Sequence, residues 1–178
     1  MKKFASSIFN IISIVLSALI YVFLSQPYFS VNYDVGGWGG GSIDLLSGYQ
    51  CIENFVESAN SEYVMLAVSL IFLTIFAAII ILCSIINLLV NMGVIKNKKV
   101  YKFSNFANIA SSILMFVFVA IGFFIMIDLT KDVSIDLGFT KGSFNIAWAS
   151  ILNLIISLGM IIITILAYKF NKNSKKKK

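Results

Sequence analysis

Four long apolar runs dominate the chain, over residues 4–24, 63–90, 103–127 and 146–168. Each exceeds the roughly 18 residues that mark a segment able to cross a bilayer. None alternates apolar and polar residues like the strands of a membrane barrel, so each is predicted to be a helix that pairs its own backbone groups. The pattern predicts an all-α membrane protein whose single domain, residues 1–178, is a four-transmembrane-helix bundle.

The first run begins with two lysines and an apolar stretch, as a secretory signal peptide does. Its apolar part is long, and no A-x-A-like cleavage site follows it. We therefore expect an uncleaved membrane anchor. Cleavage is the alternative, and it would leave three spans.

The charged residues between the runs predict the orientation. Two lysines precede the first run, four lie in residues 91–102, and six lie in the tail, residues 169–178. All eight acidic residues lie instead in residues 25–62 and 128–145, with only Lys131 and Lys141 beside them. Because basic residues are enriched in cytoplasmic loops, both termini are expected in the cytoplasm of a plasma-membrane protein.

The two acidic segments are then extracellular loops, and both contain strand-like stretches. "PYFSVNYDV" and "GSIDLL" occur in the first loop and "DVSIDLGF" in the second, with alternation typical of half-buried strands. They predict a small extracellular β-sheet formed by the two outer loops, with "ENFVESAN" as a short helix or a helical lead-in to the second span. The tetrapeptide "SIDL" occurs at 42–45 and again at 134–137, which we interpret as one strand meeting its counterpart. An internal duplication is the alternative origin of the two copies.

The residue types present argue against enzymatic chemistry. The chain has no histidine and no arginine, which removes the usual general base near neutral pH and the bidentate clamp for phosphate. The interiors of the apolar runs carry no charged residue, although proton relays and ion-coupled carriers normally need one. The outer acidic residues are too widely spaced for a calcium site. We predict a non-enzymatic protein with no catalytic residue, cofactor or metal site.

The two cysteines, Cys51 and Cys83, lie at different predicted depths, so a disulfide between them is not expected. Cys51 is interpreted as a small, half-buried apolar residue, with pairing between chains as the alternative.

Small polar residues recur at helical spacing within the runs and define one face of each predicted helix. These candidate residues are Asn10, Ser13 and Ser17 in the first run, Ser84 and Asn87 in the second, Asn108 in the third, and Ser150, Asn153 and Ser157 in the fourth, where the face is expected to begin at Ser143. The favoured interpretation is that these faces pack together through hydrogen bonds between helices. The alternative is a polar path for a solute, for which Asn153 is the residue to test.

Trp38 and Asp44 are the candidate partner contacts. Trp38 stands among five glycines in "GGWGGG", and Asp44 belongs to the strand-like segment that follows. An exposed tryptophan is a common anchor in protein interfaces. A tryptophan folded onto the sheet or the headgroups is the alternative. Most other aromatic residues of the outer side, such as Tyr28 and Trp148, are attributed to an interfacial belt.

The first outer loop resembles that of uncharacterised small four-span bacterial membrane proteins. The matching elements are Pro27, Tyr28 and Phe29 after the first span and then "SIDLLSG", residues 42–48. The layout is also similar to that of claudins, with "GGW" at the place of their Gly-Leu-Trp signature, but this loop has one cysteine where claudins have two. The first resemblance implies the topology and no activity, and the second is an architectural analogy.

The expected partners follow from the membrane setting. They are the lipid bilayer, anionic lipids at the lysine-rich tail, and either a second copy of the chain or another membrane protein; nucleic acid is not needed to explain the positive charge. The leading hypothesis is a structural, interaction or accessory subunit. A small channel or export component and an immunity protein against a membrane-active peptide are the alternatives. The abundance of Lys, Asn and Ile without Arg suggests a bacterial source.

Overall fold

The computed structural model describes residues 2–34, 40–131, 134–136 and 141–175. Among these residues, four helices are long and apolar enough to cross a membrane, judged by length and composition. They are α1 (Lys2–Leu24), α3 (Ser61–Met92), α4 (Lys98–Lys131) and α5 (Trp148–Lys175). The four helices predicted from the apolar runs are therefore confirmed, and they are consistent with a helical membrane bundle. A shorter helix, α2 (Gly48–Phe55), precedes α3.

Local side chains and backbone turns define where these helices begin and end. The Asn60 Oδ1 accepts a hydrogen bond from the Glu62 amide at 2.8 Å, and the Asn97 Oδ1 accepts one from the Lys99 amide at 2.9 Å. Both are side-chain caps on helix N-termini. At the other end of α3, Gly93 has φ +86°, a conformation that glycine adopts without strain.

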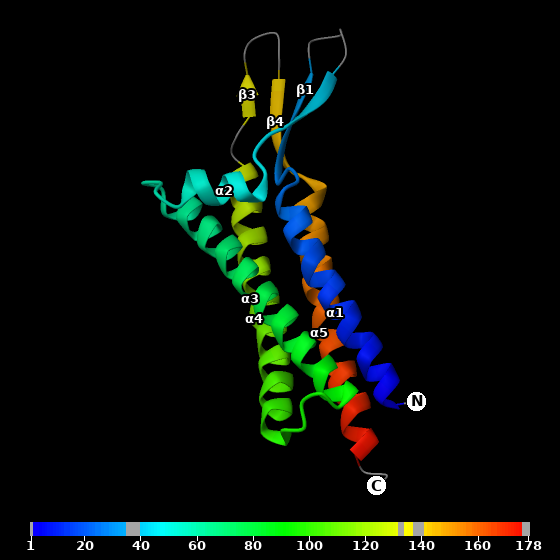
Figure 1. Cartoon of the computed structure of the whole chain (residues 1–178). Helices are drawn as coiled ribbons and strands as arrows, with labels where there is room; N and C mark the ends of the chain where they lie inside the picture. The colour runs from blue at the N-terminus through cyan, green and yellow to red at the C-terminus, as the bar shows by residue number, and fades with distance from the viewer. Residues whose placement is uncertain (1, 35–39, 132–133, 137–140, 176–178) are drawn as a thin grey trace. The chain divides into compact units, whose positions relative to one another are not determined.

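The strands form one four-stranded antiparallel sheet in the order β2-β1-β4-β3. The strands are β1 (Phe29–Asp34), β2 (Gly40–Asp44), β3 (Ser134–Asp136) and β4 (Lys141–Ile146). Figure 1 shows β1 continuing from the end of α1 and β4 leading into α5. The prediction of a small sheet built from both long loops is confirmed. The strand β4 was not predicted, and Ser143 lies on it, so its assignment to a helix face is wrong.

The two copies of "SID" lie on opposite edges of the sheet. Ser42–Asp44 belong to β2, which pairs with β1, and Ser134–Asp136 form β3, which pairs with β4. The expectation that one copy meets the other is therefore wrong. The order along the chain also differs, because the first hairpin runs from inner to edge strand and the second from edge to inner strand. That reversal argues against a simple duplication of the two halves.

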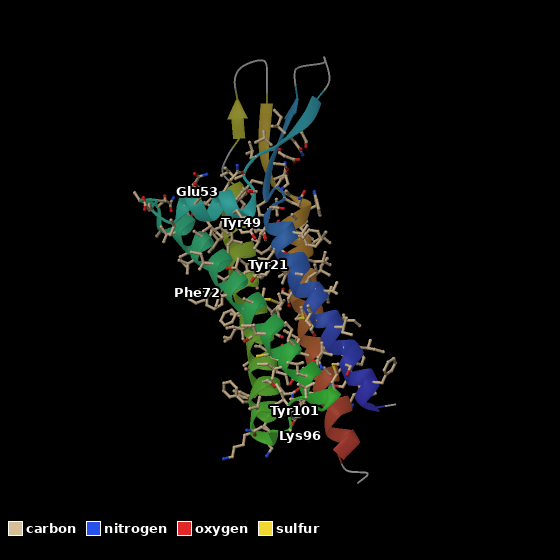
Figure 2. All side chains as sticks on the ribbon, in the orientation of Figure 1. Tyr21, Tyr49, Glu53, Phe72, Lys96 and Tyr101 are labelled. Carbon is tan, nitrogen blue, oxygen red and sulfur yellow. The ribbon has the colours of Figure 1, made fainter. Side chains whose placement is uncertain are left out.

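The chain divides into two compact units, and all four long helices contribute segments to both. Unit 1 comprises Met1–Tyr21, Leu73–Val117 and Ile155–Lys178, and unit 2 comprises Val22–Phe72 and Phe118–Leu154. Unit 1 contains the turn between α3 and α4, with Lys96 and Tyr101 near it (Figure 2). Unit 2 contains α2 and the whole sheet.

Candidate interaction surface and buried polar clusters

A cluster of amide and hydroxyl groups joins α3 to α4 in unit 1. The Oδ1 of Asn87 accepts hydrogen bonds from the Ser104 hydroxyl at 2.5 Å and from the Asn105 amide at 3.2 Å. One turn away, the Nδ2 of Asn108 donates to the Ser84 hydroxyl at 3.2 Å. All five side chains are buried. Because each bond joins one helix to the next, the cluster pins the register of this helical hairpin.

Further polar contacts attach α1 to its neighbours in the same unit. The Nδ2 of Asn91 lies 3.4 Å from the hydroxyl of Ser6, and the Ser6 hydroxyl donates to the carbonyl of Ala167 at 3.1 Å. At the other end of α1, the Tyr21 hydroxyl donates to the Thr74 carbonyl at 2.7 Å. These contacts link α1 to α3 at both ends and to α5 at one.

Some buried polar side-chain atoms lack a hydrogen-bond partner in the protein. Within the part of the chain that the structure describes, the Oδ1 atoms of Asn10, Asn108 and Asn153 and the Oγ of Ser17 accept or donate no hydrogen bond. Buried polar groups are usually paired, and ordered water commonly satisfies those that protein groups do not reach.

In unit 2, Asn153 of α5 meets Tyr28, which directly precedes β1. The Asn153 Nδ2 donates to the Tyr28 hydroxyl, and both side chains are almost completely buried. Burial raises the pKa of the Tyr28 phenol well above its usual range, so this group stays neutral. The contact fastens the start of the sheet to the first turns of α5. Tyr28 is therefore a core residue and not part of an interfacial aromatic belt.

The segment "LLSG" after β2 has a structural role that the sequence reading missed. Ser47 and Gln50 form a capping box at the start of α2, with bonds of 3.2 Å and 2.9 Å. The spacing S-x-x-Q was readable from the sequence as a helix start. The next residue, Gly48, lies so close to α1 that a Cβ there would be 2.8 Å from Leu24 Cδ2 and 2.9 Å from Tyr28 Cε2. No local sequence pattern indicates that close approach.

The nine predicted polar-face residues are all buried. The structure brings together Ser84 with Asn108, and it gives Asn87 and Asn153 the partners described above. The hydroxyls of Ser13 and Ser150 instead donate to backbone carbonyls three or four residues earlier in the chain, those of Phe9 and Ala147. Across the described ranges, no group of three or more His, Cys, Asp or Glu side chains is placed to hold a metal ion.

The strand β2 is an exposed edge strand of the sheet. It pairs with β1 on one side only, and every residue from Gly40 to Asp44 is exposed. Asp44, a predicted partner contact, lies on this edge, whereas Trp38 lies outside the described residues. Ile43 of this strand is 54% exposed.

Both cysteines are free and buried. Cys51 is fully buried in α2, more deeply than the half-buried position expected, and burial raises the pKa of its thiol to about 12. A raised thiol pKa keeps the group protonated and unreactive near neutral pH.

No model of a known protein family matches the chain, and comparison with curated proteins also gives no match.

Proposed function

We propose that this protein is a non-enzymatic, multi-pass plasma-membrane protein of bacterial origin that works as a structural or accessory subunit, and that it binds its partner through the edge of β2. The observation that carries the proposal is the exposed strand Gly40–Asp44, with its outer backbone groups free of the sheet. An exposed edge strand is a template for another extended chain, which adds main-chain hydrogen bonds to the sheet.

The composition of this edge suits strand addition. Gly40 and Gly41 leave the backbone unshielded, and Ile43 offers an apolar contact. Natural proteins protect a free edge with lysine, proline or a bulge. The strand β2 has no lysine or proline. The partner is therefore expected to be a second copy or another membrane protein that supplies an extended segment.

The charge distribution supports an orientation for this surface. Unit 1 contains twelve of the lysines, and unit 2 contains all eight acidic residues. By the positive-inside rule the sheet lies outside the cell and both termini lie inside. The lysines of the tail then contact anionic lipids, each contributing about 1 kcal/mol.

A cysteine placed on β2 tests the proposal in native membranes. Ser42→Cys puts an exposed thiol in the middle of the strand. The two native cysteines give little background because both are buried. Burial raises the pKa of the Cys51 thiol to about 12, so this thiol stays protonated at pH 8, and the thiolate is the reactive form. The probe is a short membrane-impermeant thiol-to-amine crosslinker.

We expect Ser42→Cys to give crosslinked species, either multimers of the chain or an adduct with one other membrane protein. Asn54→Cys is the matched control, since Asn54 is an exposed residue of α2 in the same unit. It should remain monomeric under identical conditions. Only monomer with both variants, or equal crosslinking of both, would contradict an interface at β2.

A further inference from the structure

An apolar pocket lies in unit 2, where the sheet meets the helices. It has a volume of about 160 Å³ and is lined by Phe29, Leu45, Leu46, Phe55, Tyr63, Leu129 and Thr130. An apolar cavity of about 150 Å³ can stay dry and hold a benzene-sized group. The pocket is therefore large enough for a short hydrocarbon segment.

The lining has little to offer a polar ligand. Six of its seven side chains are apolar or aromatic, and the hydroxyl of Thr130 already bonds to the carbonyls of Met126 and Ile127, at 3.0 Å each. The rings of Phe55 and Tyr63 stack with centroids 4.6 Å apart and form a flat wall. Backbone bonds from Leu45 to Phe29 and from Tyr28 to Leu46, at 2.9 Å and 2.8 Å, hold the opposite wall. The pocket is preformed for an apolar occupant.

The position of the pocket along α3 and α4 indicates which apolar molecules surround it. Tyr63 lies in the first turn of α3, and Leu129 and Thr130 lie in the last turn of α4. Both helices are candidate membrane spans, so these residues mark the ends of two spans. The ends of spans lie at the border between hydrocarbon and headgroups. Acyl chains are the abundant apolar molecules at that level.

Charged residues near the lining favour one class of lipid. Four acidic residues lie within two positions, along the sequence, of a lining residue: Glu53 (Figure 2), Glu57, Glu62 and Asp128. A lysine beside them, Lys131, is paired with Asp128 at 2.8 Å. This surplus of carboxylates repels an anionic headgroup and attracts a cationic amine. We propose that the pocket binds part of an acyl chain from a lipid with a zwitterionic headgroup. The inference shares the membrane placement of the proposed function but does not depend on strand pairing at β2.

Photocrosslinking in proteoliposomes tests this inference with the full chain. The probe is phosphatidylcholine that carries a diazirine near the end of one acyl chain, and the adducts are mapped by peptide mass spectrometry. We expect adducts on the lining residues. Leu45→Trp should reduce them about tenfold, because each buried methylene group is worth about a fourfold change in affinity. Leu45 is 40% exposed, so the larger side chain can be accommodated at the mouth.

Ile43→Trp is the matched control, because Ile43 lies two residues away, is 54% exposed and does not line the pocket. It should leave the adducts unchanged. Leu129→Phe fills the pocket from α4 and should reproduce the loss, with the exposed Ile121→Phe as its control.

Unchanged adducts in both Leu45→Trp and Leu129→Phe would overturn the proposal. So would adducts that form on a co-purified protein and not on the lining residues. Equal labelling by a matched phosphatidylglycerol probe would overturn the headgroup preference. Because these readouts follow lipid and not partner protein, they separate failure here from failure of the β2 interface.

Discussion

Gly48 occupies a position where a side chain would collide with the end of α1. The nearest atoms include the Leu24 carbonyl oxygen, which would lie 3.0 Å from a Cβ at this position, and backbone cannot move aside as a flexible side chain can. The capping box of Ser47 and Gln50 starts α2 at this point, so the close approach also determines where α2 packs. A single residue thus sets the contact between the end of α1 and the start of α2.

We predict that Gly48→Ala destabilises the protein by about 1–3 kcal/mol, the usual cost of overpacking a close contact. The measurement is the shift of the thermal unfolding midpoint in detergent. Gly159→Ala is the control, because a Cβ there meets nothing within 4 Å. It should be neutral or slightly stabilising, since alanine favours helix over glycine. Equal loss in both variants would show that the effect is not local to the α1–α2 contact.

At the scale of elements, hydrogen bonds between side chains link α3 to α4 within unit 1. Asn87 alone accepts two bonds from α4, and Ser84 accepts another. The helical spacing of the polar residues predicted their shared faces, because that spacing follows from the helix repeat. The individual partners could not be predicted, since pairing depends on how far each helix is shifted along its neighbour.

Asn87→Leu is expected to cost about 1 kcal/mol, because bonds between membrane helices average about 0.6 kcal/mol each and two are lost. Unfolding by titration with a denaturing detergent measures the change. Ser13→Ala is the matched control, because the Ser13 hydroxyl bonds to the Phe9 carbonyl of its own helix. If instead the clusters line a solute path, Asn87→Leu would leave stability unchanged and alter flux into liposomes.

The strands show why the sheet was only partly predictable. The alternation of polar and apolar residues in "SVNYDV" is the sequence pattern that indicates a half-buried strand. The β4 segment "KGSFNI" alternates over its last four residues only, and its place in the sheet follows from pairing with β1 over six residues, a contact between distant parts of the chain. The edge position of both "SID" segments likewise results from strand pairing, which these three residues do not encode.

At the scale of the whole molecule, the apolar runs made the four long helices predictable because lipid requires long uncharged segments. The orientation remains a prediction from charge. It implies that Ser42 of β2 and Val94 of the turn between α3 and α4 lie on opposite sides of the membrane. The Val94 side chain is 67% exposed, so a cysteine at this position is accessible to a reagent on that side of the membrane.

A membrane-impermeant maleimide applied to intact cells should label Ser42→Cys and not Val94→Cys. Val94→Cys should react only after the membrane is permeabilised, while the native chain, with both cysteines buried, reports the background. Labelling of Val94→Cys in intact cells would reverse the proposed orientation. It would also place the sheet and its β2 edge in the cytoplasm.

The even number of strands restricts how neighbouring copies could join. In the order β2-β1-β4-β3 every neighbour is antiparallel, so the two edge strands run in opposite directions. Copies inserted in one membrane share the same upright orientation, and strands that run along the membrane normal keep their direction from one copy to the next. Two β2 edges could then meet only as parallel strands, whereas β2 of one copy and β3 of the next meet in the more stable antiparallel arrangement. Such a contact joins unlike surfaces, so it builds rings or open rows of copies and not a symmetric dimer.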